Sequence, residues 1–186
     1  MKCTMARHNG WRLSACLVLL TSLSGCGYSA TRLLPSNYRN VYVEPFQNKI
    51  RITEEVSERL GFQTNVPGLE EKVTRGVIDR FLFDGNLRVT TKPEEADLIL
   101  TGALTDFYRQ PLRRTDDSTV EEYRLNLVAA LSLRDRHDNL VWEEPGFIGD
   151  ATYVASGSSA TSESDAVVAL TNDFARRVVE RVIENW

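Results

Sequence analysis

The sequence YRLNLVAALSLR, residues 123–134, places Tyr, Leu or Ala at every odd position, whereas the even positions also carry Arg, Asn and Ser. Because successive side chains of a β-strand point to opposite faces, this period of two predicts a long strand with one apolar and one more polar face. A sheet with one polar face is typical of antiparallel pairing. The segment therefore predicts an antiparallel sheet that is covered on one side.

Other segments with strand character lie on both sides of this stretch. They are residues 41–46, 87–91, 96–108, 140–143 and 147–154. Pro45 has no N–H to donate, which indicates a strand end or a sheet edge, and Pro145 predicts a bend in the last strand. Gly102 predicts a bulge or a close backbone approach. An Arg-rich connection is expected to follow Tyr108.

Two segments have helical periodicity. Their apolar residues recur every four positions: Leu69, Val73, Val77 and Phe81 in the first, and Ala166, Leu170, Phe174, Val178 and Val182 in the second. Gly85 is expected to end the first helix, and Ser162 or Ser164 to cap the second. Each helix is therefore amphipathic and buries one face.

These elements predict an α+β fold in the form of a two-layer sandwich. Two amphipathic helices pack on one face of a four- to five-stranded, mixed but mainly antiparallel sheet. The chain has 186 residues, of which 42% are hydrophobic, and this is enough for one core. We therefore expect a single domain over residues 41–186, with an inserted loop over residues 48–66.

The N-terminus has the pattern of a secretory signal peptide over residues 1–25. Basic residues within residues 1–12 precede an uncharged, mostly apolar stretch over residues 13–23. That stretch is far shorter than the ~20 residues that a membrane-spanning helix needs. The segment then ends in Leu23-Ser24-Gly25-Cys26, which resembles the bacterial lipobox.

The resemblance to a lipobox implies that Cys26 becomes the mature N-terminus and carries diacylglyceryl and N-acyl lipid. Several acyl chains on one residue hold a protein firmly at a membrane. Gly27, where an Asp is absent, resembles outer-membrane sorting signals. Residues 26–40 then form the lipidated N-terminus and a tether. Cleavage removes Cys3 and Cys16, so an internal disulfide is excluded.

The charge and residue types exclude several functions. Lys and Arg number 22 against 26 Asp and Glu, which gives no general basis for nucleic-acid binding. No zinc, phosphate-loop or nucleophile motif occurs, so no catalytic residue and no cofactor are assigned beyond the lipid on Cys26. Asp135, His137 and Asp138 fit a metal site or a polar hairpin tip, and the tip is favoured because a second ligand set is missing.

Charged clusters offer two further interpretations. The paired acids Glu70/Glu71, Asp116/Asp117, Glu121/Glu122 and Glu143/Glu144 are acid–base candidates. Neighbours on a strand point to opposite faces, which favours a solvated surface instead. Arg113 and Arg114, near Arg109, fit either a phosphate contact or a solvated turn.

Several motifs, taken in order, resemble the LptE family of LPS-assembly lipoproteins. They are residues 25–28 (GCGY), 41–48 (VYVEPFQN), 68–71 (GLEE), 83–89 (FDGNLRV), 96–102 (ADLILTG), 122–125 (EYRL), 141–144 (VWEE) and a final helix ending in Trp186. The resemblance covers almost all of the mature length. It implies a fold of two helices on a small sheet, in agreement with the periodicity.

The resemblance also implies a lipid-anchored plug and assembly partner of the LptD outer-membrane β-barrel, which inserts lipopolysaccharide into the outer leaflet. It places the chain at the periplasmic face of the outer membrane and makes Arg113 and Arg114 the lipopolysaccharide-binding candidates. Two features depart from the family. Residues 49–66 are longer than its usual linker, and residues 155–165 lack Lys and Arg.

Two other functions remain open on the sequence. An outer-membrane lipoprotein that binds or activates a cell-wall synthase would share the lipobox, the tether and the small sheet. A periplasmic enzyme would use the clustered carboxylates. Recovery of a cell-wall synthase with the chain would favour the first, and loss of function on replacing the paired acids would favour the second.

Replacing Cys26 with alanine tests the lipidation site. Because Cys26 is the one cysteine left after cleavage, Cys26→Ala should abolish incorporation of labelled palmitate and move the protein from the membrane pellet to the soluble periplasmic fraction. Palmitate labelling that survives the substitution would contradict the assignment.

Overall fold

The computed structural model describes residues 37–51, 66–114, 119–157 and 159–184. The chain divides into two compact units, residues 1–32 and 33–186, and every described residue belongs to the second. The expected signal peptide, Cys26 and most of the tether lie outside the described residues. In order, the elements are β1 (Asn40–Val43), β2 (Gln47–Asn48), α3 (Leu69–Asp84), β3 (Arg88–Val89), a 3₁₀ turn (Pro93–Glu95), β4 (Leu98–Arg114), β5 (Val120–Asp135), β6 (Leu140–Val154) and α4 (Glu163–Glu184).

The strands form one mixed sheet in the order β3-β1-β4-β5-β6. β4, β5 and β6 are antiparallel neighbours, whereas β1 runs parallel to both β3 and β4. β2 also pairs with β4, parallel to it, through Gln47 and Asn48. The predicted mixed, mainly antiparallel sheet is confirmed, and β2 brings it to six strands.

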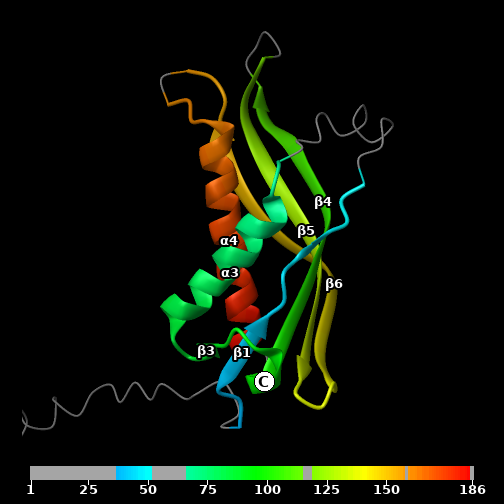
Figure 1. The fold of residues 1–186 in the computed structure, drawn as a ribbon. Helices are drawn as coiled ribbons and strands as arrows, with labels where there is room; N and C mark the ends of the chain where they lie inside the picture. The colour runs from blue at the N-terminus through cyan, green and yellow to red at the C-terminus, as the bar shows by residue number, and fades with distance from the viewer. Residues whose placement is uncertain (1–36, 52–65, 115–118, 158, 185–186) are drawn as a thin grey trace, which may run out of the picture. The chain divides into compact units, whose positions relative to one another are not determined.

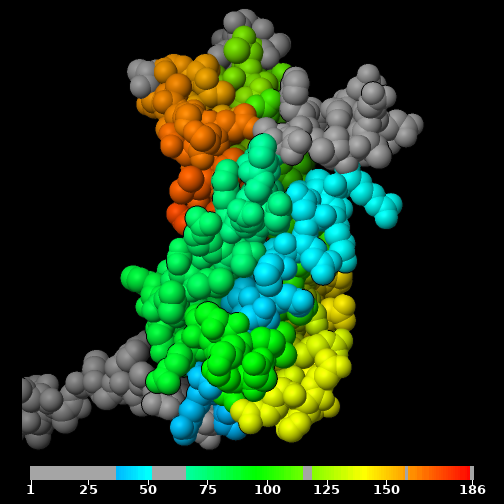
Figure 2. Space-filling view, in the orientation of Figure 1, coloured from blue at the N-terminus to red at the C-terminus, as the bar shows by residue number. Residues whose placement is uncertain are grey.

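Both helices pack on the same side of the sheet, as predicted (Figure 1). The stripes expected on α3 and α4 are buried in one continuous core with the leucines of β5. α3 ends at Gly85, which has a φ of 75° and donates its N–H to the carbonyl of Phe81 at 3.0 Å. α4 is capped by Ser162, whose Oγ accepts the N–H of Asp165 at 3.1 Å. Figure 2 shows α3 packed along residues 37–51.

Two strand ends differ from the prediction. β4 was expected to end at Tyr108 and to lead into an Arg-rich connection, but pairing with β5 continues to Arg114 opposite Val120. Pro111 interrupts this end with a register shift and does not stop it. The bend expected at Pro145 is likewise a register shift inside a continuous β6. β6 is an edge strand, where a proline without an N–H is tolerated.

A buried carboxylate holds the start of β1. Asp97 is 6% exposed, and one of its oxygens accepts the N–H groups of Arg39 and Asn40, each at 2.9 Å. Its other oxygen pairs with the guanidinium of Arg136 from the β5–β6 turn. Three donors thus satisfy a charge that would be costly to bury alone. The point at which the chain enters the sheet is therefore tied to two other segments.

α4 is also attached along the outer edge of β6. Asp173 accepts the N–H of Asp150 at 3.2 Å, and Arg177 contacts Asp150 at 2.8 Å and Asp173 at 2.7 Å. Burial alone raises the pKa of Asp173, but the hydrogen bonds from Arg176 and from the Asp150 N–H, with the charge of Arg177, lower it below the ordinary value. These contacts also cover backbone that an edge strand would otherwise expose.

Two glycines allow close packing inside the core. A Cβ on Gly102 would lie 2.2 Å from the ring of Phe46, which confirms the close approach expected there. A Cβ on Gly149 of β6 would lie 2.7 Å from the Cβ and 2.9 Å from the Cα of Phe174. At Gly149 the obstacle includes helix backbone, so α4 can approach β6 this closely only over a glycine.

A substitution at Gly149 tests this contact. Gly149→Ala should lower the free energy of unfolding by about 1–3 kcal/mol, because the added methyl overpacks the seam between β6 and α4. Gly146→Ala in the same strand is the matched control, since its Cβ meets nothing within 4 Å and its effect should stay within about 0.5 kcal/mol. Urea unfolding measures both, and equal stabilities would contradict the packing described.

Candidate functional site

The end of the β4–β5 hairpin carries the arginines singled out from the sequence. In Figure 1 these two strands run past the first turn of α4. Arg113 pairs in register with Glu122, and Arg114 with Val120. Both side chains are exposed, and Arg113 forms an ion pair with Glu121 at 2.9 Å while remaining 60% exposed. Their exposure is compatible with both a phosphate contact and a solvated turn, and residues 115–118, which include Asp116 and Asp117, lie outside the described part.

Arg109 has a different environment from Arg113 and Arg114. Its guanidinium lies 4.3 Å from the ring centre of Tyr123, donates to the hydroxyl of Tyr153 at 3.0 Å and pairs with Glu163 at 3.3 Å. The side chain is only 16% exposed. Arg109 therefore connects the sheet to the first turn of α4, and the structure separates it from the two exposed arginines.

Two tyrosines complete this cluster beneath the hairpin end. Tyr123 and Tyr153 stack with ring centres 5.7 Å apart. Burial raises the pKa of Tyr153, and the hydrogen bond from Arg109 offsets part of that increase. Tyr153 is therefore neutral at physiological pH and acts as a packing and hydrogen-bonding group. The cluster supports the hairpin end rather than offering a reactive group.

An exposed leucine lies beside the two arginines. Leu112 is 44% exposed and directly precedes Arg113. An exposed ion pair such as Arg113–Glu121 is worth about 1 kcal/mol or less, so Arg113 can exchange Glu121 for a phosphate at little cost. The hairpin end thus offers guanidinium groups next to an apolar side chain. Leu112 was not predicted as a site residue, because its only signal in the sequence is that an apolar residue stands between Pro111 and the arginines.

The acidic turn at residues 135–139 has the geometry of a hairpin tip, as favoured from the sequence. Asp135 accepts the N–H groups of His137 at 2.8 Å and Asn139 at 2.9 Å, and Asp138 has a φ of 62°. The side-chain hydrogen bond from Asn139 is the largest cause that lowers the pKa of Asp135. Within the described residues, no group of three or more His, Cys, Asp or Glu is arranged to hold a metal.

The paired acids Glu143 and Glu144 of β6 lie on opposite faces of the sheet. Glu144 faces α4 and binds Arg181 at 3.0 Å, whereas Glu143 lines a hollow on the opposite face of the sheet. Strand geometry therefore separates the two carboxylates, as expected. Asp116 and Asp117 lie outside the described residues.

Among the described helices, none is long and apolar enough to cross a membrane.

Comparisons with known proteins agree with this fold. The solved structure of an uncharacterized lipoprotein B from Nitrosomonas europaea matches with a TM-score of 0.53 and 14% identity, over 86% of this chain and 90% of that one. A hypothetical protein from Chlamydia trachomatis matches with a TM-score of 0.50 and 15% identity, over 78% of this chain and 95% of the other. At such identities the likeness shows the fold alone.

No curated protein sequence matches the chain. A family model does match, and it covers residues 38–182, which include every described strand and nearly all of α4. The model is that of LptE, described as lipopolysaccharide-assembly. The chain therefore belongs to the LptE family of lipopolysaccharide-assembly lipoproteins.

Proposed function

We propose that this chain is a lipid-anchored partner of an LptD-type outer-membrane β-barrel and assists the insertion of lipopolysaccharide into the outer leaflet. The family match over residues 38–182 is the observation that carries the proposal. The lipobox at residues 23–26 supports attachment through Cys26 at the periplasmic face of the outer membrane. The role requires no catalysis by the chain.

The open face of the sheet supports insertion into a barrel. Both helices cover the other face, so the one that contains Thr101, Ser132 and Glu143 is available to a partner. Ala103 and Ala130 leave a hollow of about 210 Å³ there, and Val128 and Ile148 lie farther along the same face. The interior of a large outer-membrane barrel is polar and is filled in many cases by a plug. The polar side chains around the hollow suit contact with such a wall.

The hairpin end supports a direct contact with lipopolysaccharide. Arg113 and Arg114 present exposed guanidinium groups, which bind phosphate with two parallel hydrogen bonds where the geometry allows. Leu112 places an apolar side chain next to them. A phosphorylated lipid combines the same two chemistries, so we assign its phosphates to these arginines.

Co-purification tests the barrel partnership. The chain, with an affinity tag at its C-terminus, is recovered from detergent-solubilised envelopes, and its partners are identified by mass spectrometry. We expect a large outer-membrane barrel in amounts comparable to the chain itself. Recovery of a cell-wall synthase in place of a barrel would overturn the proposal.

Reversing the charges at the hairpin end tests the lipopolysaccharide contact. Arg113→Asp with Arg114→Asp should weaken lipopolysaccharide binding by about tenfold per residue, because each charge-assisted hydrogen bond to phosphate contributes about 1.5 kcal/mol or more. The matched control is Arg88→Asp with Lys92→Asp, which makes the same change of charge at exposed positions outside the hairpin. Equal binding by both double variants would remove the hairpin end from the site.

A further inference from the structure

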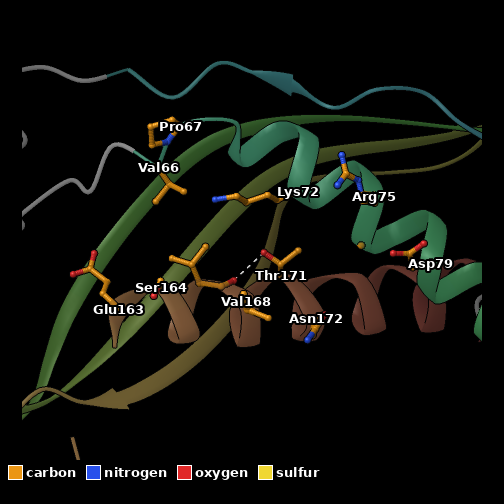
Figure 3. A pocket seen from close by; sticks show the side chains of 12 residues that line it. Val66, Pro67, Lys72, Arg75, Asp79, Glu163, Ser164, Val168, Thr171 and Asn172 are labelled. Carbon is orange, nitrogen blue, oxygen red and sulfur yellow. Dashed lines mark hydrogen bonds between the residues drawn. The ribbon is translucent and has the colours of Figure 1, made fainter. Parts of the chain in front are cut away.

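The two helices leave a groove between them on the side away from the sheet. Their backbones come close at Gly76 of α3, where a Cβ would lie 2.9 Å from the Cγ2 of Thr171 in α4. Toward the first turns of both helices a cavity of about 560 Å³ opens between them (Figure 3). Figure 2 shows that α3 leaves the first turns of α4 uncovered.

The walls of this groove are mainly apolar. Val66 and Pro67 contribute from the segment before α3, and Val167 and Val168 from α4. Thr171 donates its hydroxyl to the carbonyl of Val167 at 2.9 Å, which leaves its methyl group facing α3. Val168 is 59% exposed, although α4 already buries a full apolar stripe. The helix therefore presents more apolar surface than its own core uses.

Lys72 lies at the rim of the groove. Figure 3 shows Lys72 extending from α3 toward Val66, and no ion pair engages Lys72 or Arg75 within the part of the chain that the structure describes. Of the two acids that line the groove, Glu163 is already paired with Arg109 at 3.3 Å. Asp79 lies one turn beyond Arg75. The lining thus carries two cations and two acids, and among the described residues Lys72 is the cation at this end that the acids leave available.

We propose that this groove binds a single-chain lipid with a phosphate head group. The alkyl chain lies between Val168 and Pro67, and the phosphate contacts Lys72, with Arg75 adding to the positive potential. A volume of about 560 Å³ falls in the range of small-ligand pockets, about 300–1,000 Å³, and suits one chain rather than a folded partner. The site is separate from the hairpin arginines, and it does not depend on the barrel partnership.

Dodecyl phosphate is a suitable probe for this site. The full chain with Cys26→Ala is purified without detergent, which would otherwise compete for the groove, and titrated calorimetrically below the concentration at which the probe forms micelles. We expect saturable binding of one dodecyl phosphate per chain, with inorganic phosphate alone failing to bind. Dodecyltrimethylammonium should bind at least about tenfold more weakly, because its charge is opposite.

Two pairs of variants locate the binding. Val168→Glu and Lys72→Glu should each weaken binding of dodecyl phosphate by about tenfold or more. Their controls are Ile148→Glu, at an apolar position of β6 that is 44% exposed, and Lys92→Glu, at an exposed lysine outside the groove; both should bind as the parent does. All four positions are exposed, so the fold tolerates the changes.

The possible results separate this proposal from the one on the barrel. Equal binding by Val168→Glu and Ile148→Glu would overturn the groove as the site, and equal binding of the ammonium probe would overturn the phosphate assignment. A chain that co-purifies with the barrel but does not bind dodecyl phosphate would refute the groove site alone. A chain that binds the probe but recovers no barrel would refute only the partnership.

Discussion

β4 and β5 pair from Leu98 opposite Asp135 to Arg114 opposite Val120, and the other strands take their places along the two edges of this ladder. One face of the ladder carries the leucines of β5, and burial of that face requires both helices on the same side. Neither helix covers the opposite face. The same ladder continues past the helices and carries Arg113 and Arg114 to its end. Sheet pairing therefore positions both surfaces on which the proposed function depends.

The elements with strong periodicity could be predicted from sequence, because burial of one face leaves a regular apolar pattern. Residues 123–134 predicted β5, and the two apolar stripes predicted α3 and α4. Strand ends could not be predicted as well, since pairing partners decide them. The end of β4 near Pro111 is held by β5, and Pro145 is tolerated because β6 lies at the edge. β2 has only two residues and forms because β4 lies beside it.

The separate role of Arg109 shows why the site was harder to predict than the fold. In the first half of β4 the even residues Leu98, Leu100 and Leu104 are buried. A register shift between Leu104 and Asp106 then adds one residue, and the odd residues Phe107 and Arg109 face the helices. Such a bulge exchanges the two faces of a strand. If the alternation of Leu98, Leu100 and Leu104 is continued along the sequence without this shift, Arg109 is placed on the face of the sheet opposite to the one that it occupies.

The distribution of paired and unpaired charges distinguishes structural surfaces from surfaces available for binding. Arg177 and Arg181 pair with acids of β6, and Arg136 pairs with the buried Asp97, so the charges along the α4–β6 edge and at the start of β1 hold elements together. Among the residues that the structure describes, no ion pair joins α3 to α4, although Lys72 lies at their seam. This seam therefore differs from the α4–β6 edge: its exposed lysine lies beside exposed apolar side chains, and these are the two groups that the proposed lipid would contact.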